Sequence, residues 1–182
     1  MRGFTTLADR MSPPALIALL NRYFDCQVPA IVEHGGEVLK FMGDGLLAIF
    51  PIRPEGDVAA ICNEALAAAD TARVRLAELS GAARAEGASE LRFGVALHVG
   101  EFLYGNIGSG NRLDFTCIGP AVNLAARLEK LTGKLGRSVA VSSDFAALCA
   151  RPLTRLGEFE LPGFSSVQTV YGLPDDAPRG SA

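Results

Sequence analysis

The sequence is poor in the residues that build metal clusters and disulfides. Its 182 residues include 4 cysteines and 2 histidines. No two cysteines form a CxxC pair, and His34 and His98 lie far apart along the chain. A zinc site is therefore not expected, because such sites take several closely spaced cysteine and histidine ligands. Isolated cysteines in a largely apolar chain are instead typical of small core residues in a reducing compartment.

Long apolar runs and concentrations of positive charge are also missing. No apolar run approaches the roughly 20 residues of a membrane helix, and residues 1–6 lack the apolar core of a signal peptide. The 17 Lys and Arg residues are scattered among 20 Asp and Glu residues, for a net charge of -3. The basic stripe of a nucleic-acid-binding protein is thus absent. We expect a cytoplasmic segment without nucleic-acid or direct membrane contact, although a longer parent protein could be anchored in a membrane.

The chain does contain helix and strand patterns typical of one globular domain, and 49% of its residues are hydrophobic. Ser12-Pro13-Pro14 is typical of a helix start with a capping hydroxyl. Pro29 is expected to kink this helix before Gly35-Gly36 ends it. After it we expect a hairpin over 37–50, a helix over 57–79 and a loop over 81–89. A strand over 91–97 and its antiparallel partner over 102–107 follow, then a loop over 108–111, a strand over 114–118 and a helix over 121–131. The last expected elements are a strand over 138–141, a helix over 143–149 and strands near 158 and over 167–171. The mixture predicts an α+β fold with helices packed on one face of a sheet and a disordered tail over 174–182.

A carboxylate stands at the centre of the predicted hairpin. Gly43-Asp44-Gly45 separates two short apolar runs, and glycines accept the positive φ angles of tight turns. A carboxylate at such a tip, without bulky neighbours, can reach a hard cation such as magnesium. Taken alone, the three residues are more typical of a plain Asp-Gly turn. The metal interpretation therefore depends on the surrounding sequence.

Three stretches resemble the catalytic motifs of class III adenylyl and guanylyl cyclases, and they come in that family's order. Residues 36–45, Gly-Glu-Val-Leu-Lys-Phe-Met-Gly-Asp-Gly, resemble the metal-binding hairpin. Residues 1–6, Met-Arg-Gly-Phe-Thr-Thr, resemble the end of the first metal motif. Residues 114–119, Asp-Phe-Thr-Cys-Ile-Gly, which lead into 121–129, Ala-Val-Asn-Leu-Ala-Ala-Arg-Leu-Glu, resemble the transition-state motif. The resemblance covers residues 1–173 and implies the ferredoxin-like cyclase fold, with an antiparallel-rich sheet and helices on one face.

The resemblance also implies a reaction and its metals. The ribose 3′-hydroxyl of ATP would attack the α-phosphate, giving cyclic AMP for intracellular signalling and releasing pyrophosphate. Two Mg²⁺ or Mn²⁺ ions, held by two aspartates, would activate the hydroxyl and neutralise the leaving charge. Asp44 matches the second aspartate, and Met1 would lend a backbone carbonyl to one metal. The backbone of Gly3, Phe4 and Thr5 would bind the triphosphate through N–H groups at a helix start.

Asn123 and Arg127 lie four residues apart and so share one face of the predicted helix. In the family that they resemble, the asparagine orients the ribose and the arginine stabilises charge that develops on the phosphate. Outside this motif, Arg127 would be interpreted as a solvated helix arginine.

The choice of base depends on Lys40 and Thr116 by the same resemblance. Adenine offers an acceptor at N1 and a donor at N6, which match an ammonium and a side-chain oxygen. Guanine reverses this pattern, and the guanylyl members use an acidic residue in place of the lysine. Cys117 is adjacent to Thr116, but successive residues of a strand point to opposite faces. The alternative for Lys40 is an exposed hairpin lysine.

The sequence departs from the family's pattern at three places. The first metal aspartate directly precedes the position of Met1 and is absent, together with the strand that leads into it. Truncation, a misassigned start or a degenerate domain would each explain this, and the other chemical residues favour truncation. Pro120 replaces an acidic residue that is common in the family. A phosphate-binding lysine expected near Pro162 or Phe164 is missing.

The sequence therefore predicts an adenylate cyclase domain over 1–173 that acts as a homodimer with shared active sites. Asp44 of one chain would face Lys40, Thr116, Asn123 and Arg127 of the other. Two alternatives stay open: a degenerate, non-catalytic nucleotide-binding or dimerisation module, and a guanylate cyclase. A diguanylate cyclase would need a Gly-Gly-acidic-Glu-Phe signature at the hairpin, which the sequence lacks.

Overall fold

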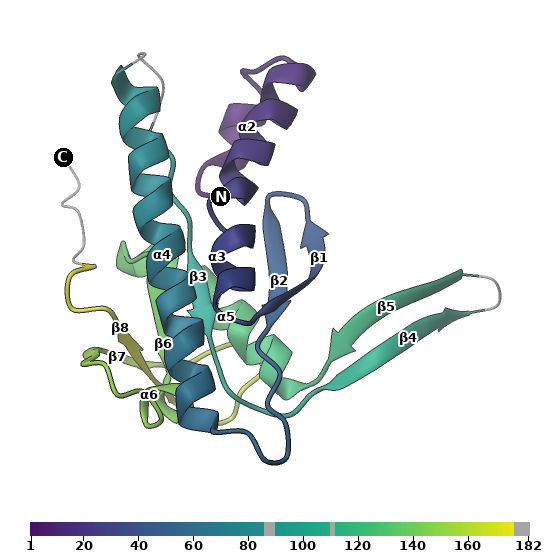
Figure 1. Ribbon diagram of the computed structural model, residues 1–182, viewed down its shortest axis with the longest axis vertical. Coiled ribbons are helices and arrows are strands. Elements are labelled where there is room, and N and C mark those ends of the chain that lie inside the picture. Colours follow the sequence, from purple (N-terminus) through teal and green to yellow (C-terminus); the bar gives the residue numbers. More distant parts are fainter. Residues whose placement is uncertain (86–89, 110–111, 177–182) are drawn as a thin grey trace. The chain divides into compact units, whose positions relative to one another are not determined.

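The computed structural model describes residues 1–85, 90–109 and 112–176, which fall into two compact units. The first unit is Met1–Gly94 and the second is Val95–Ala182. Figure 1 shows the chain coloured along its sequence with its helices and strands labelled. Each unit combines helices with strands, so the α+β class predicted from the sequence is confirmed.

Four helices belong to the first unit: α1 (Phe4–Ala8), α2 (Pro13–Asp25), α3 (Val28–Glu33) and α4 (Val58–Ala85). The expected kink at Pro29 is instead a break, because Pro29 lies in the first turn of a new helix, where its missing N–H is tolerated. Ser12 precedes α2 in an extended conformation, but its hydroxyl does not cap the helix. The stretch Pro13–Glu33 is long and apolar enough to cross a membrane by length and composition alone, although it runs through both helices.

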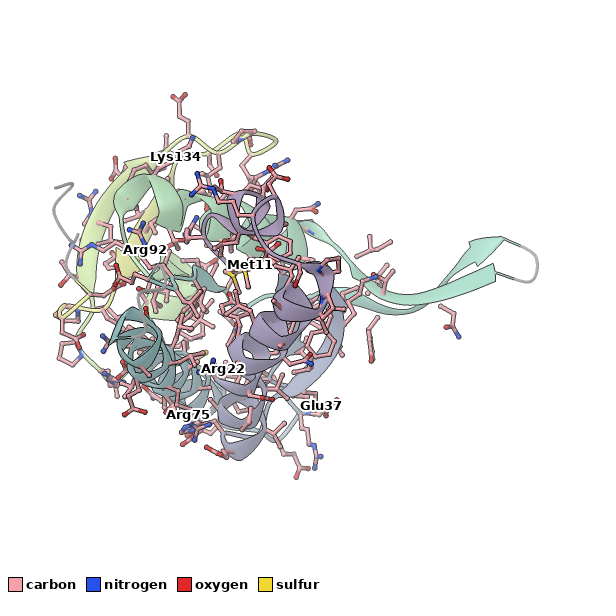
Figure 2. The ribbon with its side chains drawn as sticks, turned by 90° about the horizontal axis from the view of Figure 1, so that it is seen from above. Met11, Arg22, Glu37, Arg75, Arg92 and Lys134 are labelled. Atoms are coloured by element: carbon pink, nitrogen blue, oxygen red, sulfur yellow. The ribbon has the colours of Figure 1, made fainter. Side chains whose placement is uncertain are left out.

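Helix α4 is rich in alanine, and its small side chains allow close packing. Ala65, Leu66 and Ala72 are buried. Two ion pairs join α4 to the end of α3: Arg75, labelled in Figure 2, lies 2.7 Å from Glu33, and His34 Nδ1 lies 2.7 Å from Glu64. These contacts hold α4, which follows the hairpin, against the end of α3, which precedes it.

The predicted loop over 81–89 is wrong for its first part, because α4 continues to Ala85, while 86–89 lie outside the described residues. A single exposed glycine such as Gly81 weakens a helix by only about 1 kcal/mol. Just before it, the buried Ser80 hydroxyl accepts the Leu91 amide at 2.8 Å, which ties this end of the helix to the following segment.

The predicted hairpin is confirmed as β1 (Glu37–Met42) and β2 (Gly45–Ile49), which pair antiparallel. Gly36 must be glycine, since a Cβ there would come within 2.7 Å of both Ile31 and Phe50. Gly43 has φ 62°, the left-handed conformation that the turn requires. The hairpin is therefore anchored to α3 at its base and turns sharply at the tip.

The second unit is built on a four-stranded sheet in the order β3-β6-β8-β7. The strands are β3 (Val95–Leu97), β6 (Val139–Ser142), β7 (Thr154–Phe159) and β8 (Gln168–Gly172). Only β3 and β6 pair in parallel. Helix α5 (Pro120–Leu135) packs its apolar stripe on this sheet in a core formed by Leu124, Leu128, Leu131, Ala140, Leu161 and Val170. The short helix α6 (Ser143–Ala146) follows β6 directly.

Two strand predictions were wrong. The strand expected over 91–97 is reduced to Val95–Leu97, although Leu91 and Phe93 are buried with the predicted alternation. The segment expected to pair with it forms β4 (Leu103–Ser109), which pairs with β5 (Arg112–Ile118) instead. β3 pairs in parallel with the fully buried β6 instead, and alternation within one segment does not identify such a distant partner.

The end of the second unit is held by a buried carboxylate. Asp176 is 8% exposed, and its Oδ2 accepts the amides of Ser138 at 2.6 Å and Val139 at 2.9 Å. Arg137 also donates to the Asp176 carbonyl. Asp176 belongs to the tail expected to be disordered, and here it caps the start of β6; residues 177–182 lie outside the described part.

Replacing Asp176 with alanine should destabilise the chain by about 1–3 kcal/mol, because two buried backbone amides lose their acceptor. Asp176→Asn, which keeps one oxygen, should lose less. Urea unfolding measures both variants, with exposed Asp9→Ala as the matched control. Equal stability of Asp176→Ala and Asp9→Ala would contradict the capping role.

Candidate active site

Two oxygens of Asp44, one from the side chain and one from the main chain, face the positively charged terminal nitrogen of Met1. The Met1 nitrogen lies 2.8 Å from Asp44 Oδ2 and 3.0 Å from the Asp44 main-chain oxygen. The nitrogen is buried, and the Asp44 side chain is 33% exposed. The chain folds so that two residues matched to separate metal motifs meet at one point. Two hard oxygens facing a cation are the donor type that Mg²⁺ and Mn²⁺ prefer.

The segment after Met1 makes a tight turn into a short helix. Gly3 has φ 70° and precedes α1, so that Phe4 and Thr5 form the first turn. The Arg2 amide donates to the Arg92 carbonyl at 2.7 Å, which fixes this segment beside residues 91–94. The backbone predicted to bind the triphosphate therefore follows directly after Met1, whose nitrogen contacts Asp44.

Lys40 lies on β1, opposite Leu47 on β2 and four residues before Asp44. It is half-buried rather than fully exposed, and it takes part in an interaction within the fold. The structure thus gathers Met1, Lys40 and Asp44 on one hairpin and its neighbouring turn.

The remaining predicted residues lie in the second unit, on β5 and on the helix that follows it. Thr116 is half-buried and pairs with Gly105, whereas the adjacent Cys117 is buried at 8% exposure. Asn123 is exposed in the first turns of α5, and its backbone N–H donates to the Gly119 carbonyl at 3.2 Å. Arg127 follows one turn later and is half-buried.

The side chains of Asn123 and Arg127 make no hydrogen bond or ion pair with the part of the chain that the structure describes. The predicted residues thus form two groups: Met1, Gly3, Phe4, Thr5, Lys40 and Asp44 in the first unit, and Thr116, Asn123 and Arg127 in the second.

One polar contact near α5 was not predicted from the sequence. His98 Nδ1 lies 2.8 Å from the buried Ser142 hydroxyl. Burial lowers the pKa of His98, and the nearby Asp144 carboxylate partly opposes this effect. The sequence signal was present but weak: a histidine ends the strand pattern at 98, and Ser142 stands at an N-cap position.

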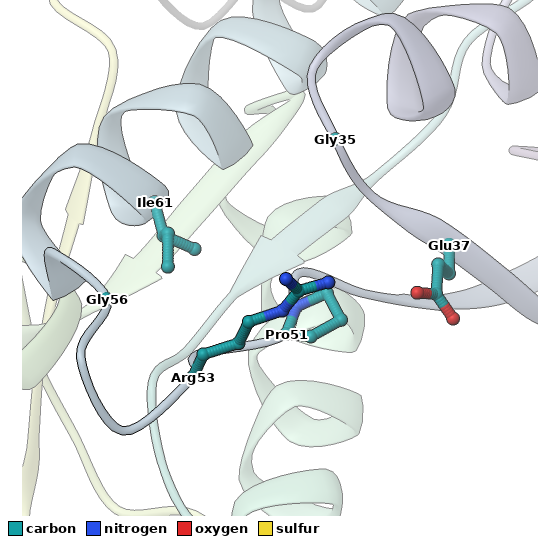
Figure 3. Close-up of a pocket in the computed structure, with 6 residues that line it drawn as sticks. All are labelled: Gly35, Glu37, Pro51, Arg53, Gly56 and Ile61. Atoms are coloured by element: carbon teal, nitrogen blue, oxygen red, sulfur yellow. The ribbon is translucent and has the colours of Figure 1, made fainter.

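A shallow pocket of about 300 Å³ lies elsewhere in the first unit, beside the base of the hairpin. It is lined by Gly35, Glu37, Pro51, Arg53, Gly56 and Ile61. Figure 3 shows Arg53 extending past Pro51 toward the Glu37 carboxylate. None of the predicted site residues lines this pocket.

The family model described as "Adenylate and Guanylate cyclase catalytic domain" matches residues 1–173. Adenylate cyclase 1 of Rhizobium meliloti is 32% identical over 175 residues, which are 92% of this chain and 25% of that protein. The adenylate cyclase of Anabaena cylindrica is 30% identical over 144 residues, 79% of this chain and 28% of that protein. The chain thus spans about a quarter of the length of these curated relatives.

Solved structures of the same kind share the fold. The adenylyl cyclase CyaB from P. aeruginosa has a TM-score of 0.81 at 27% identity, covering 100% of this chain and 92% of its own. A bacterial light-regulated adenylyl cyclase has a TM-score of 0.83 at 29% identity, covering 97% of this chain and 86% of its own. The guanylyl cyclase Cya2 has a TM-score of 0.79 at 26% identity, covering 99% of this chain and 93% of its own. The predicted cyclase fold is confirmed. The chain belongs to the family of adenylate and guanylate cyclase catalytic domains.

Proposed function

We propose that this domain is an adenylate cyclase that converts ATP to cyclic AMP and pyrophosphate. The observation that carries the proposal is the pair Asn123 and Arg127, one helical turn apart, with both side chains unengaged by the described residues. Both side chains are therefore available to contact a ligand, and they stand at the positions that the transition-state motif assigns to the ribose and the phosphate. The curated relatives named as adenylate cyclases support the same reaction.

We propose that Asp44 is a ligand of the divalent metals that the family generally uses. Its carboxylate and carbonyl already face one cationic nitrogen, so the site accepts positive charge. When a residue is joined to the Met1 nitrogen, the ammonium becomes a neutral amide and Asp44 needs another cation. A residue joined to Met1 would lie beside Asp44 by covalent geometry, at the position where the resemblance implies the first metal aspartate. Two bound Mg²⁺ or Mn²⁺ ions would activate the hydroxyl and neutralise the leaving pyrophosphate.

The protein groups around the phosphate act by position and charge. The oxygen of the ribose 3′-hydroxyl forms a bond to the α-phosphorus while the bond from the α-phosphorus to the oxygen bridging to the β-phosphate breaks. Pyrophosphate leaves with the electron pair of that bond, and the hydroxyl proton passes to solvent water. Arg127 places a fixed positive charge near the phosphate, and Asn123 holds the ribose so that the hydroxyl faces phosphorus. Groups of this kind contribute several kcal/mol when they are arranged before the reaction begins.

We propose that adenine is read by Lys40 and Thr116. The Lys40 ammonium donates to N1, and the Thr116 hydroxyl accepts from the N6 amine. The half-buried state of both residues favours a role at a partly desolvated base. Both an adenylyl and a guanylyl cyclase are similar in fold to this chain, so the base depends on these two side chains.

We further propose that the active species is a cytoplasmic homodimer in which Asp44 of one chain serves Asn123 and Arg127 of the other. The exposed apolar residues Phe41 and Met42 beside Asp44, and Leu103 and Ile118 on the β4–β5 arm, support such an interface. Domains of this family typically dimerise.

A non-catalytic nucleotide-binding module is the second candidate. The observation in its favour is that no group of three or more His, Cys, Asp or Glu side chains gathers anywhere in the described chain, Asp44 included. The two candidates differ in whether a carboxylate precedes Met1, which the first experiment tests.

Residues 1–182 alone should show little or no cyclase activity, and a chain extended upstream of Met1 should show Mg²⁺- or Mn²⁺-dependent turnover. In the extended chain, Asp44→Asn should lower kcat/KM on the order of 100-fold or more, since metal charge stabilisation is worth several kcal/mol. Exposed Glu55→Gln is the control. Robust cyclic AMP formation by residues 1–182 would show that the first metal ligand has been misplaced.

The extended chain should prefer ATP over GTP by on the order of tenfold to several-thousandfold in kcat/KM. Each of two mismatched groups on guanine leaves buried polar atoms unpaired, at roughly 1–3 kcal/mol apiece. Lys40→Glu combined with Thr116→Cys should erode or reverse the preference. Cyclic nucleotide formed from each substrate is the measurement, and better use of GTP by the unmutated chain would overturn the adenylyl assignment.

Mixing inactive Asp44→Ala and Arg127→Ala chains should restore activity, because a heterodimer contains one intact site. Random pairing predicts about a quarter of the unmutated activity for a symmetric dimer with two shared sites. Asp44→Ala mixed with further Asp44→Ala is the control. A mixture as inactive as its components would count against shared sites.

A further inference from the structure

His98 joins two strands at the end where their pairing stops. Strand β3 pairs in parallel with β6 as far as Leu97 opposite Val141. One residue further on, His98 Nδ1 lies 2.8 Å from the Ser142 hydroxyl. The side-chain bond therefore continues the connection beyond the last paired residues.

The Ser142 hydroxyl has a second partner that determines how it can bond to His98. Its oxygen accepts the Phe145 amide at 3.2 Å and caps α6. The hydroxyl then has one hydrogen to donate, and Nδ1 of a neutral ring can accept it. With the hydroxyl assigned as the donor to Nδ1, the ring hydrogen lies on Nε2. Burial favours the same neutral state by lowering the pKa of His98.

The other side of the ring faces the start of α5. A Cβ placed on Gly100 would lie 3.0 Å from His98 Nε2 and 2.9 Å from the Ala121 Cβ. Gly100 is thus held in a space that admits only glycine, between the ring and the first turn of α5. Gly119 makes a similar approach, because its Cβ would lie 3.3 Å from the Phe102 Cα.

The segment from His98 to Phe102 is therefore seated on residues 119–121, where α5 begins. Asn123 follows two residues later, and its backbone N–H donates to the Gly119 carbonyl at 3.2 Å. Any movement of the 98–102 segment would be passed to this part of the helix. Misplacing a reacting group by about 1 Å can lower a rate about 100-fold.

We propose that His98 is a positioning residue for the cyclisation: held neutral by Ser142, it supports the 100–102 segment against the start of α5 and so sets the position of Asn123. The role of Asn123 in this statement rests on the proposed cyclase function. Protonation would turn Nδ1 into a donor and leave the buried Ser142 hydrogen without its acceptor. The charged group that acts on the ring is Asp144 on α6, which opposes the effect of burial. Glu101 lies in the same segment and is exposed to solvent.

The kinetic test compares His98→Leu, His98→Asn and, as the control, the exposed Glu55→Gln, in the extended chain. His98→Leu should lower kcat about 100-fold while KM changes less than about threefold, because the defect concerns orientation rather than nucleotide binding. In His98→Asn the side-chain oxygen can accept from Ser142, and it should recover most of the loss. Glu55→Gln should leave kcat unchanged.

The pH profile separates this role from simple packing. Activity of the unmutated chain should fall on the acid side, below the ordinary histidine pKa of 6.5. His98→Asn cannot titrate and should lose that limb of the profile. The proposal is overturned if His98→Leu keeps kcat within about threefold, or if His98→Asn retains the acid limb.

A second measurement does not depend on the cyclase function. Hydrogen exchange is measured on residues 1–182. In His98→Leu the backbone N–H of Asn123 should exchange at least about tenfold faster than in the unmutated chain, while the backbone N–H of the buried Leu128 in the same helix should be unchanged. Acceleration at neither amide, or equally at both, would overturn the positioning claim. An inactive extended chain with accelerated exchange at Asn123 alone would reject the proposed function but keep the role of His98 in holding α5.

Discussion

One electrostatic contact joins the start of the chain to the hairpin: the carboxylate of Asp44 faces a positive partner at the tip of a tight turn. Its Oδ2 and main-chain oxygen converge on the Met1 nitrogen. The Asp44 side chain is only 33% exposed, and removing a carboxylate from water is unfavourable in free energy unless a cation or several hydrogen-bond donors face it. The local fold serves this requirement, since Gly43 permits the turn and Gly36 lets the hairpin pack closely on Ile31 and Phe50.

The position of the second group of proposed site residues depends on how α5 begins. The helix starts at Pro120, whose fixed φ suits the first turn, and its apolar stripe is buried through Leu124, Leu128 and Leu131. That packing fixes the rotation of the helix about its axis. The rotation leaves Asn123 exposed and Arg127 half-buried, on the side away from the core. The contacts of Gly100 and Gly119 fix the position of the first turn.

Much of the fold and of the candidate site could be predicted from sequence because the signals were local. The turn at Asp44, the helix carrying Asn123 and Arg127, and the hairpin with Lys40 each follow from a few adjacent residues. The errors concerned partners that are distant in the chain. Strand alternation over 91–97 correctly predicted the burial of Leu91 and Phe93, but alternation does not name the neighbouring strand. β4 therefore pairs with β5, and β3 with β6. The His98–Ser142 bond spans 44 residues and was missed for the same reason.

The separation of the site into two groups has a physical advantage for a nucleotide cyclase. The triphosphate carries several negative charges, and a preformed cluster containing both Arg127 and Lys40 with no carboxylate would repel itself. Lys40 lies on the hairpin and Arg127 on a helix of the other unit, so these like charges are carried by separate elements. In the proposed dimer Asp44 of the partner chain serves both, and the nucleotide with its metal ions supplies the charges that they bind. Catalysis in such a site is coupled to assembly, because neither group alone contains both the metal ligand and the residues that stabilise the transition state.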